Sequence, residues 1–249
     1  MSVRIRADQL VFQQGLAESR EKARSLIMAG RVCIASPVHF NGLLKPGHLF
    51  SSETRFELIP GKDFVSRGAH KLATILDGFD IDVSGLVCVD AGASTGGFTD
   101  CLLQRGAEKV YAIDVGRNQL HENLRKDNRV ISMEGINLRY AKPDLIPEKV
   151  DFLTGDVSFI SLTLILPPCT AWLKPNALVA LLIKPQFELD PKRVHKGVVR
   201  DEEDRQQAID KVVGFCQREL GFRLQGVLPA KIRGPKGNQE YMALFRGPD

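Results

Sequence analysis

From residue 65 onward, short apolar runs alternate with stretches whose apolar residues recur at helical spacing. The runs lie near residues 86–90, 109–114, 129–133, 150–154, 178–184, 222–228 and 241–246. Strands that alternate with helices are typical of an α/β fold built on a parallel sheet. The pattern therefore predicts a seven-stranded, mostly parallel sheet whose last strand runs antiparallel.

The first sixty residues follow a different pattern, with two short helices and β-type segments. We expect Asp8 to cap a helix that Gly15 ends, and Ser19 to cap a second helix that Gly30 ends. The β-type segments lie at residues 32–34 and 56–59, and Pro60-Gly61-Lys62 has the composition of a linker. This change of pattern predicts a small α+β domain over residues 1–60 and a larger domain over residues 61–249.

A glycine-rich turn follows the first strand of the larger domain. The apolar run Val87-Cys88-Val89 ends in Asp90, and Gly92, Gly96 and Gly97 come next, before a helix. The second strand ends in Asp114, and an acid at that position can accept hydrogen bonds from both ribose hydroxyls of a nucleoside. The glycine spacing matches neither GxGxxG nor a P-loop, and it is typical of S-adenosylmethionine (SAM) methyltransferases. A tight turn without a cofactor is the alternative.

Four charged residues fall where the predicted topology brings chain segments to one edge of the sheet. Asp156 and Lys184 follow two of the strands, Lys71 lies near the start of a helix, and Glu240 precedes the last strand. Ligands bind open α/β sheets at the carboxyl ends of their strands. Each residue alone also fits an ordinary surface or turn position, but their joint placement predicts one polar site.

The charge of the chain permits a nucleic-acid partner without requiring one. The formal net charge is +4, with basic residues concentrated at residues 4–31 and 192–200. Such residues can grip RNA phosphate or form a solvated face. The five cysteines form no CxxC pair and the five histidines show no ligand spacing, so we expect no metal, and reduced thiols in the cytoplasm. No apolar run approaches a membrane span, so we expect no membrane partner.

The segment from Arg6 to Val32 resembles the S4 RNA-binding module. The matching residues are Arg6, Asp8, Gly15, Leu16, Ser19, Arg20, Ala23, Ile27, Gly30 and Val32. Two places depart from the module: Ala7 replaces the usual leucine, and Asn41-Gly42 comes late, after an insert at residues 35–40. The resemblance implies RNA contacts, mainly to phosphates, through Arg4, Arg6, Arg20, Lys22 and Arg24.

The larger domain resembles the ribose 2′-O-methyltransferases of the FtsJ type, which carry the same order of lysine, aspartate, lysine and glutamate. The segments DAGASTGGFTDCLLQRGAEKVYAIDVG, GDVSFISL, IKPQFE, KGVVRD and GPKGNQEY are similar to the TlyA family, often labelled hemolysin, whose members join an S4 module to such a domain. Ser66-Arg67-Gly68 matches the family's entry to this domain. Arg117-Asn118 departs from it at the cofactor rim.

This resemblance implies a Rossmann-like, SAM-dependent enzyme that methylates ribose 2′-hydroxyls of ribosomal RNA, free or in ribosomal subunits. It implies a catalytic set of Lys71, Asp156, Lys184 and Glu240, with Lys184 as the base. The SAM-binding set comprises Asp90, Ala91, Gly92, Ser94, Gly96, Gly97, Phe98, Asp114, Asn137 and Asp156. Further RNA contacts are expected from Arg67, Lys192, Arg193 and Lys236. Two alternatives remain open: a non-catalytic RNA-binding assembly factor and, with less support, a membrane-lytic hemolysin.

Overall fold

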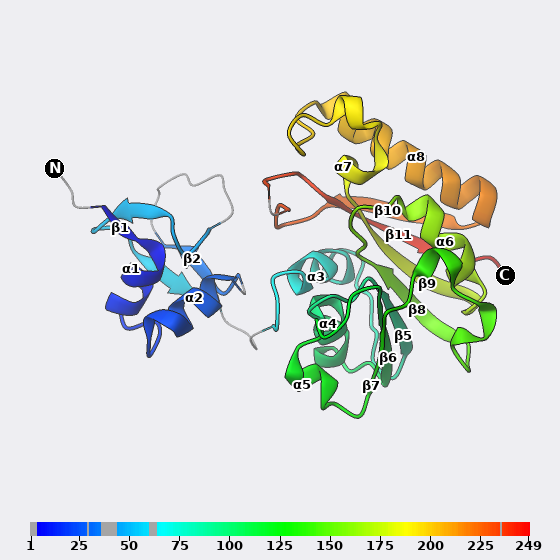
Figure 1. Cartoon of the computed structure of the whole chain (residues 1–249), viewed down its shortest axis with the longest axis horizontal. Helices are drawn as coiled ribbons and strands as arrows, with labels where there is room; N and C mark the ends of the chain where they lie inside the picture. The colour runs from blue at the N-terminus through cyan, green and yellow to red at the C-terminus, as the bar shows by residue number, and fades with distance from the viewer. Residues whose placement is uncertain (1–3, 29, 36–43, 60–63, 235) are drawn as a thin grey trace. The chain divides into compact units, whose positions relative to one another are not determined.

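The structure is a computed structural model that describes residues 4–28, 30–35, 44–59, 64–234 and 236–249. The chain divides into two compact units, residues 1–67 and residues 68–249 (Figure 1). The predicted linker at residues 60–62 and most of the predicted insert with its late Asn41-Gly42 lie outside the described residues.

The first unit is a small α+β fold. Its elements are β1 (Arg4–Arg6), α1 (Ala7–Gln13), α2 (Arg20–Met28), β2 (Val32–Ile34), β3 (Leu49–Ser51) and β4 (Phe56–Leu58). Strand β1 pairs antiparallel with β3, and β2 pairs antiparallel with β4. Both helices turn apolar residues such as Val11 and Ile27 toward Phe50 and Phe56, and this small core holds the unit together.

Helix capping in this unit differs from the prediction at one of two positions. The Ser19 hydroxyl accepts a hydrogen bond from the Lys22 amide at 3.0 Å, which confirms it as a cap. The predicted cap at Asp8 is wrong, because α1 begins at Ala7 and no side chain caps it. The Asp8 carboxylate instead accepts hydrogen bonds from the Arg6 guanidinium at 3.0 and 2.7 Å and lies 3.4 Å from Arg20. The hydrogen bonds from Arg6 lower the pKa of Asp8 despite its burial.

The second unit is built on one seven-stranded sheet. Its strands are β5 (Val87–Ala91), β6 (Lys109–Asp114), β7 (Val130–Glu134), β8 (Val150–Gly155), β9 (Leu173–Ile183), β10 (Arg223–Pro229) and β11 (Tyr241–Arg246). They lie in the order β10-β11-β9-β8-β5-β6-β7. Neighbours from β9 to β7 are parallel, whereas β11 runs antiparallel to both β9 and β10. The predicted mostly parallel sheet with an antiparallel last strand is confirmed.

Helices cover both faces of this sheet (Figure 1). They are α3 (Ala69–Gly78), α4 (Gly97–Gln104), α5 (Glu122–Arg125), α6 (Leu162–Thr170), α7 (Pro185–Glu188) and α8 (Glu202–Leu220), with short 3₁₀ turns at Leu138–Tyr140, Pro143–Leu145 and Pro191–Arg193. Alternate residues of a strand face opposite sides, so Val89 and Leu181 join the core beneath α6 and α8. Burial on both sides explains why the central strands read as continuous apolar runs.

Candidate active site

The carboxyl edge of the sheet gathers the chain segments that carry the predicted site. Strands β5, β6, β8 and β9 all end there, and α3 begins there. In the antiparallel register of β11 and β9, Tyr241 lies opposite Ile183. Glu240 and Lys184, the next residues outward, are therefore neighbours although 56 positions separate them in sequence.

The turn after β5 is shaped by a close approach of two backbones. Gly92 has φ +90°, and its amide donates a hydrogen bond to the Ile113 carbonyl at 2.8 Å. A Cβ atom at Gly92 would lie 2.6 Å from the Asp156 carbonyl oxygen, closer than carbon and oxygen can approach. Glycine is therefore required here both for its backbone angle and for lack of space.

A pocket of about 450 Å³ opens beside this turn. Asp114 lies on its wall, and its carboxylate accepts hydrogen bonds from the Ser94 amide at 2.8 Å and the Gly116 amide at 2.6 Å. The lining includes the apolar side chains Val115, Ile136, Leu138, Val157, Phe159, Ile160 and Ile165. A carboxylate beside apolar walls suits a nucleoside, because the ribose has polar hydroxyls and the base has flat ring faces that can pack against apolar side chains.

The residues predicted to bind a cofactor fall into two groups. Five of them line the pocket: Gly92, Ser94, Asp114, Asn137 and Asp156. The other five do not line it and are buried or lie in the turn behind it: Asp90, Ala91, Gly96, Gly97 and Phe98. The sequence could not distinguish the residues that line the pocket from those buried behind it, because neighbouring residues of a turn point in different directions.

Asp90 is a buried acid within the supporting group. One carboxylate oxygen accepts hydrogen bonds from the Thr99 amide at 2.9 Å and the Thr99 hydroxyl at 2.7 Å, and the other has no hydrogen-bond partner. Burial raises the pKa of Asp90 to about 7, with a smaller contribution from the nearby negative charges of Asp156 and Asp114. Asp90 therefore anchors the start of α4 at some electrostatic cost.

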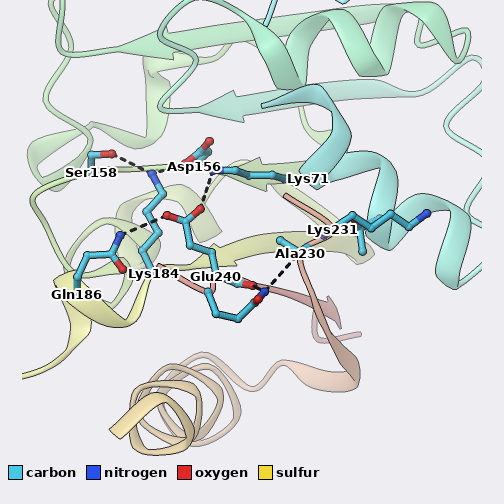
Figure 2. A network of polar contacts seen from close by, with 10 residues as sticks. Lys71, Asp156, Ser158, Lys184, Gln186, Ala230, Lys231 and Glu240 are labelled. Atoms are coloured by element: carbon cyan, nitrogen blue, oxygen red, sulfur yellow. Dashed lines mark hydrogen bonds and ion pairs between the residues drawn. The ribbon is translucent and has the colours of Figure 1, made fainter. Parts of the chain in front are cut away.

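Lys71, Asp156, Lys184 and Glu240 come together as two ion pairs (Figure 2). The Lys71 ammonium lies 2.6 Å from Glu240, and the Lys184 ammonium lies 2.5 Å from Asp156. Both lysines are only 8% exposed and Glu240 is 1% exposed. Asp156 and Ser158 line the pocket, whereas Lys184 does not. The Lys184 amine donates a hydrogen bond to Ser158 at 2.9 Å and therefore lies directly behind these two wall residues.

Gln186 contacts the ion pair of Lys71 and Glu240, a role that the sequence did not predict. Its side-chain amide donates a hydrogen bond to Glu240 at 3.2 Å, to the carboxylate oxygen that Lys71 does not contact (Figure 2). Gln186 stands two residues after Lys184, in the short helix α7. That helix is held by buried Glu188, whose carboxylate accepts the Leu162 amide at 2.8 Å and whose pKa is raised by burial. Only the motif IKPQFE hinted at these roles.

The basic residues predicted to bind RNA differ in how they are engaged. Arg193 lies 2.5 Å from Asp204 of α8, so its charge is already paired within the fold. Lys236 lies over the turn that contains Gly197, with its amine 2.7 Å from the point where a Cβ would stand. Arg4, Lys22, Arg24 and Lys192 are exposed, and burial lowers the pKa of half-buried Arg67. Arg6 and Arg20 share Asp8, as described above.

Two family models match the chain. The FtsJ-like methyltransferase model matches residues 64–246, and the S4 domain model matches residues 5–35. These matches fall in the second and first compact units, respectively, apart from the four residues before 68.

Characterised and solved relatives cover almost the whole chain. The 16S/23S rRNA (cytidine-2′-O)-methyltransferase TlyA of Mycobacterium tuberculosis is 42% identical over 251 residues, which span 99% of this chain and 91% of the relative. Hemolysin A of Brachyspira hyodysenteriae is 39% identical over 245 residues, which span 97% of this chain and 99% of the relative. A solved structure from Streptococcus thermophilus, described with the word hemolysin, is 40% identical, with a TM-score of 0.74 and coverage of 100% of this chain and 90% of that one.

Proposed function

Since the chain belongs to the TlyA family, in which an S4 domain is joined to an FtsJ-like methyltransferase domain, we propose that it methylates ribose 2′-hydroxyls of ribosomal RNA. One observation supports this most strongly: the Lys184 amine contacts both Asp156 and Ser158, two residues on the wall of a nucleoside-sized pocket. A base at that place can contact a ribose hydroxyl that lies next to a methyl donor in the pocket. We place this activity in the cytoplasm, where ribosomal RNA is found.

The pocket fits SAM by the chemistry of its donor set. Bound SAM supplies a methyl group on a positively charged sulfur. Asp114 presents acceptor oxygens at the end of β6, suited to ribose hydroxyls, and the apolar side chains on the wall suit adenine. The carboxylate of Asp156, also on the wall, is paired with Lys184 and makes this part of the wall polar.

The two ion pairs suit the transfer of a proton away from a ribose hydroxyl. A hydroxyl is a weak nucleophile and must lose its proton as it is methylated, so a base within hydrogen-bond reach is needed. Lys184 is assigned as that base: its neutral amine accepts the hydroxyl proton and becomes the ammonium that Asp156 holds, while Ser158 orients it. Lys71 and Glu240 position the ribose beside it, with Gln186 holding Glu240.

The S4 domain supplies RNA affinity in this proposal, and the larger domain supplies the chemistry. Exposed Arg24 and the half-exposed side chain of Arg20 lie on α2, where RNA phosphate can reach them. Lys192 and Lys236 are exposed basic residues of the larger domain, and Lys236 lies in the loop that leads to Glu240. The pairing of Arg193 with Asp204 makes it a weaker candidate than these two lysines.

Transfer of a labelled methyl group tests the proposal directly. Purified protein, SAM labelled in the methyl group, and ribosomal RNA or ribosomal subunits are incubated, and the RNA is digested to nucleosides. Label in a 2′-O-methyl nucleoside supports the proposal. RNA binding without any transfer would favour the assembly-factor alternative. None of the helices in the described part of the chain combines the length and apolar character needed to cross a membrane.

A further inference from the structure

Asn238 is a buried amide that joins two loops of the methyltransferase domain. Its side-chain oxygen accepts a hydrogen bond from the Val199 amide at 2.9 Å, and its side-chain nitrogen donates to the Gly197 carbonyl at 2.8 Å. The residue is 3% exposed. An amide side chain carries an acceptor oxygen and a donor nitrogen, so it can accept from one peptide group and donate to the next. Asparagine therefore fits this position by its chemistry and not only by its size.

The loop on the other side of Asn238 leads to the ion pairs. The Asn238 carbonyl accepts a hydrogen bond from the Gly234 amide at 2.9 Å, which folds the segment back on itself. A Cβ at Gly234 would overlap a carboxylate oxygen of Glu240, so the glycine leaves room for that carboxylate. Glu240 then reaches Lys71 (Figure 2). Asn238 and Glu240 thus belong to one folded segment, with the first facing Gly197 and the second facing Lys71.

The turn that Asn238 holds is basic and tightly defined. His195 and Val198 exchange backbone hydrogen bonds of 3.2 and 3.0 Å across Lys196 and Gly197. Lys196 and Gly197 have φ +51° and +81°, which closes a two-residue turn. Lys236 lies over Gly197 from the same loop as Asn238. The hydrogen bonds of Asn238 therefore bring Lys196 and Lys236, from two distant segments, to one surface.

We infer that Asn238 is a positioning residue that couples an RNA-phosphate contact, made by the Lys196–Lys236 surface, to the placement of Glu240. This inference rests on the proposed function and adds to it a defined link between substrate binding and the ion pairs. RNA phosphate fits this surface because its charge complements two lysines. Loss of the amide would free the basic turn, so RNA would bind less well while the SAM pocket, formed by other elements, stays intact.

Steady-state methylation over a range of RNA concentrations at saturating SAM tests the inference. Asn238→Asp keeps the acceptor oxygen but places a charged oxygen against the Gly197 carbonyl. The KM for RNA should rise by about tenfold, which corresponds to the loss of one or two hydrogen bonds. The matched control is Asn176→Asp, since Asn176 contacts Arg223 in another part of the domain. The control should keep the parental KM. SAM affinity, measured by calorimetry, should be unchanged in both variants.

A double-mutant cycle separates coupling from general damage. Lys236→Gln alone should raise the KM for RNA, but it should add little in an Asn238→Ala background, because the lysine surface is then no longer assembled. Additive effects, or an unchanged KM in Asn238→Asp, would overturn the inference. A fall in kcat and SAM affinity at constant KM would assign Asn238 to folding alone and would also overturn it. A parental enzyme that methylates no RNA would instead contradict the proposed function.

Discussion

Lys184 carries the chemical assignment at the scale of single residues. Lys184→Arg keeps the positive charge beside Asp156 but replaces the amine with a guanidinium, which does not deprotonate in proteins. Single-turnover methyl transfer should fall by at least about a hundredfold, the usual contribution of a general base, while SAM still binds. Near-parental turnover in this variant would leave Lys184 with a role in orientation only.

Asp114 tests the cofactor assignment. Asp114→Ala removes a carboxylate from the pocket wall and the acceptor for the Ser94 and Gly116 amides. SAM binding should weaken by roughly 1.5–3 kcal/mol, the value of hydrogen bonds to a charged group. Calorimetry measures this directly. Asp127→Ala is the control, because Asp127 pairs with Arg129 and does not line the pocket. Equal SAM affinity in the two variants would refute the assignment.

Asp90 predicts a pH dependence of stability. Its folded-state pKa of about 7 exceeds the ordinary value of 3.8, so between these pH values the folded chain holds a proton that the unfolded chain has lost. Its contribution to the free energy of unfolding is thus greatest below pH 4 and is lost as pH rises to 7. The free energy of unfolding of Asp90→Asn, relative to that of the parent, should therefore increase across this pH range by up to about 4 kcal/mol. Denaturant titrations that show a pH-independent difference would contradict this prediction.

The turn between β5 and α4 is the element on which the pocket depends. Gly92→Ala forces a side chain to positive φ and against the Asp156 carbonyl, so it should lower the free energy of unfolding by more than 1–2 kcal/mol, roughly the backbone cost alone, and weaken SAM binding. Gly85→Ala is the matched control, since Gly85 has φ +71° with open space around it. Gly85→Ala should lower the free energy of unfolding by the cost of a side chain at positive φ, and its SAM affinity should equal that of the parent. Equal SAM binding by both variants would contradict the role of this close approach.

At the same scale, the sequence predicted regular elements better than local contacts. The strands of the sheet follow directly from apolar periodicity. Their predicted topology places Asp156 and Lys184 at strand ends, Lys71 at a helix start and Glu240 before the last strand, all at one edge. The predicted helix cap at Asp8 was wrong, because the Asp8 carboxylate contacts Arg6 and Arg20 instead. The roles of Gln186 and Asn238 were not predicted, because their partners lie some forty or more residues away and no local pattern marks them.

At the scale of the whole molecule, the proposal divides the work between two domains. Arg20→Ala combined with Arg24→Ala should weaken RNA binding and reduce the slope of log affinity against log salt by about one for each phosphate that the protein no longer neutralises. Filter binding at several salt concentrations measures this slope. SAM affinity should be unchanged, and Arg129→Ala in the second unit is the control for loss of an exposed arginine outside α2. A parental salt slope in the double variant would exclude α2 as an RNA-binding surface.

The central claim is that this chain places 2′-O-methyl groups on ribosomal RNA by means of Lys184. The most direct test maps 2′-O-methylated nucleotides in ribosomal RNA from cells that express the parental chain, Lys184→Ala, or no copy of the protein. We expect at least one modified nucleotide that is present with the parental chain and absent in the other two. Identical maps from all three would contradict the claim.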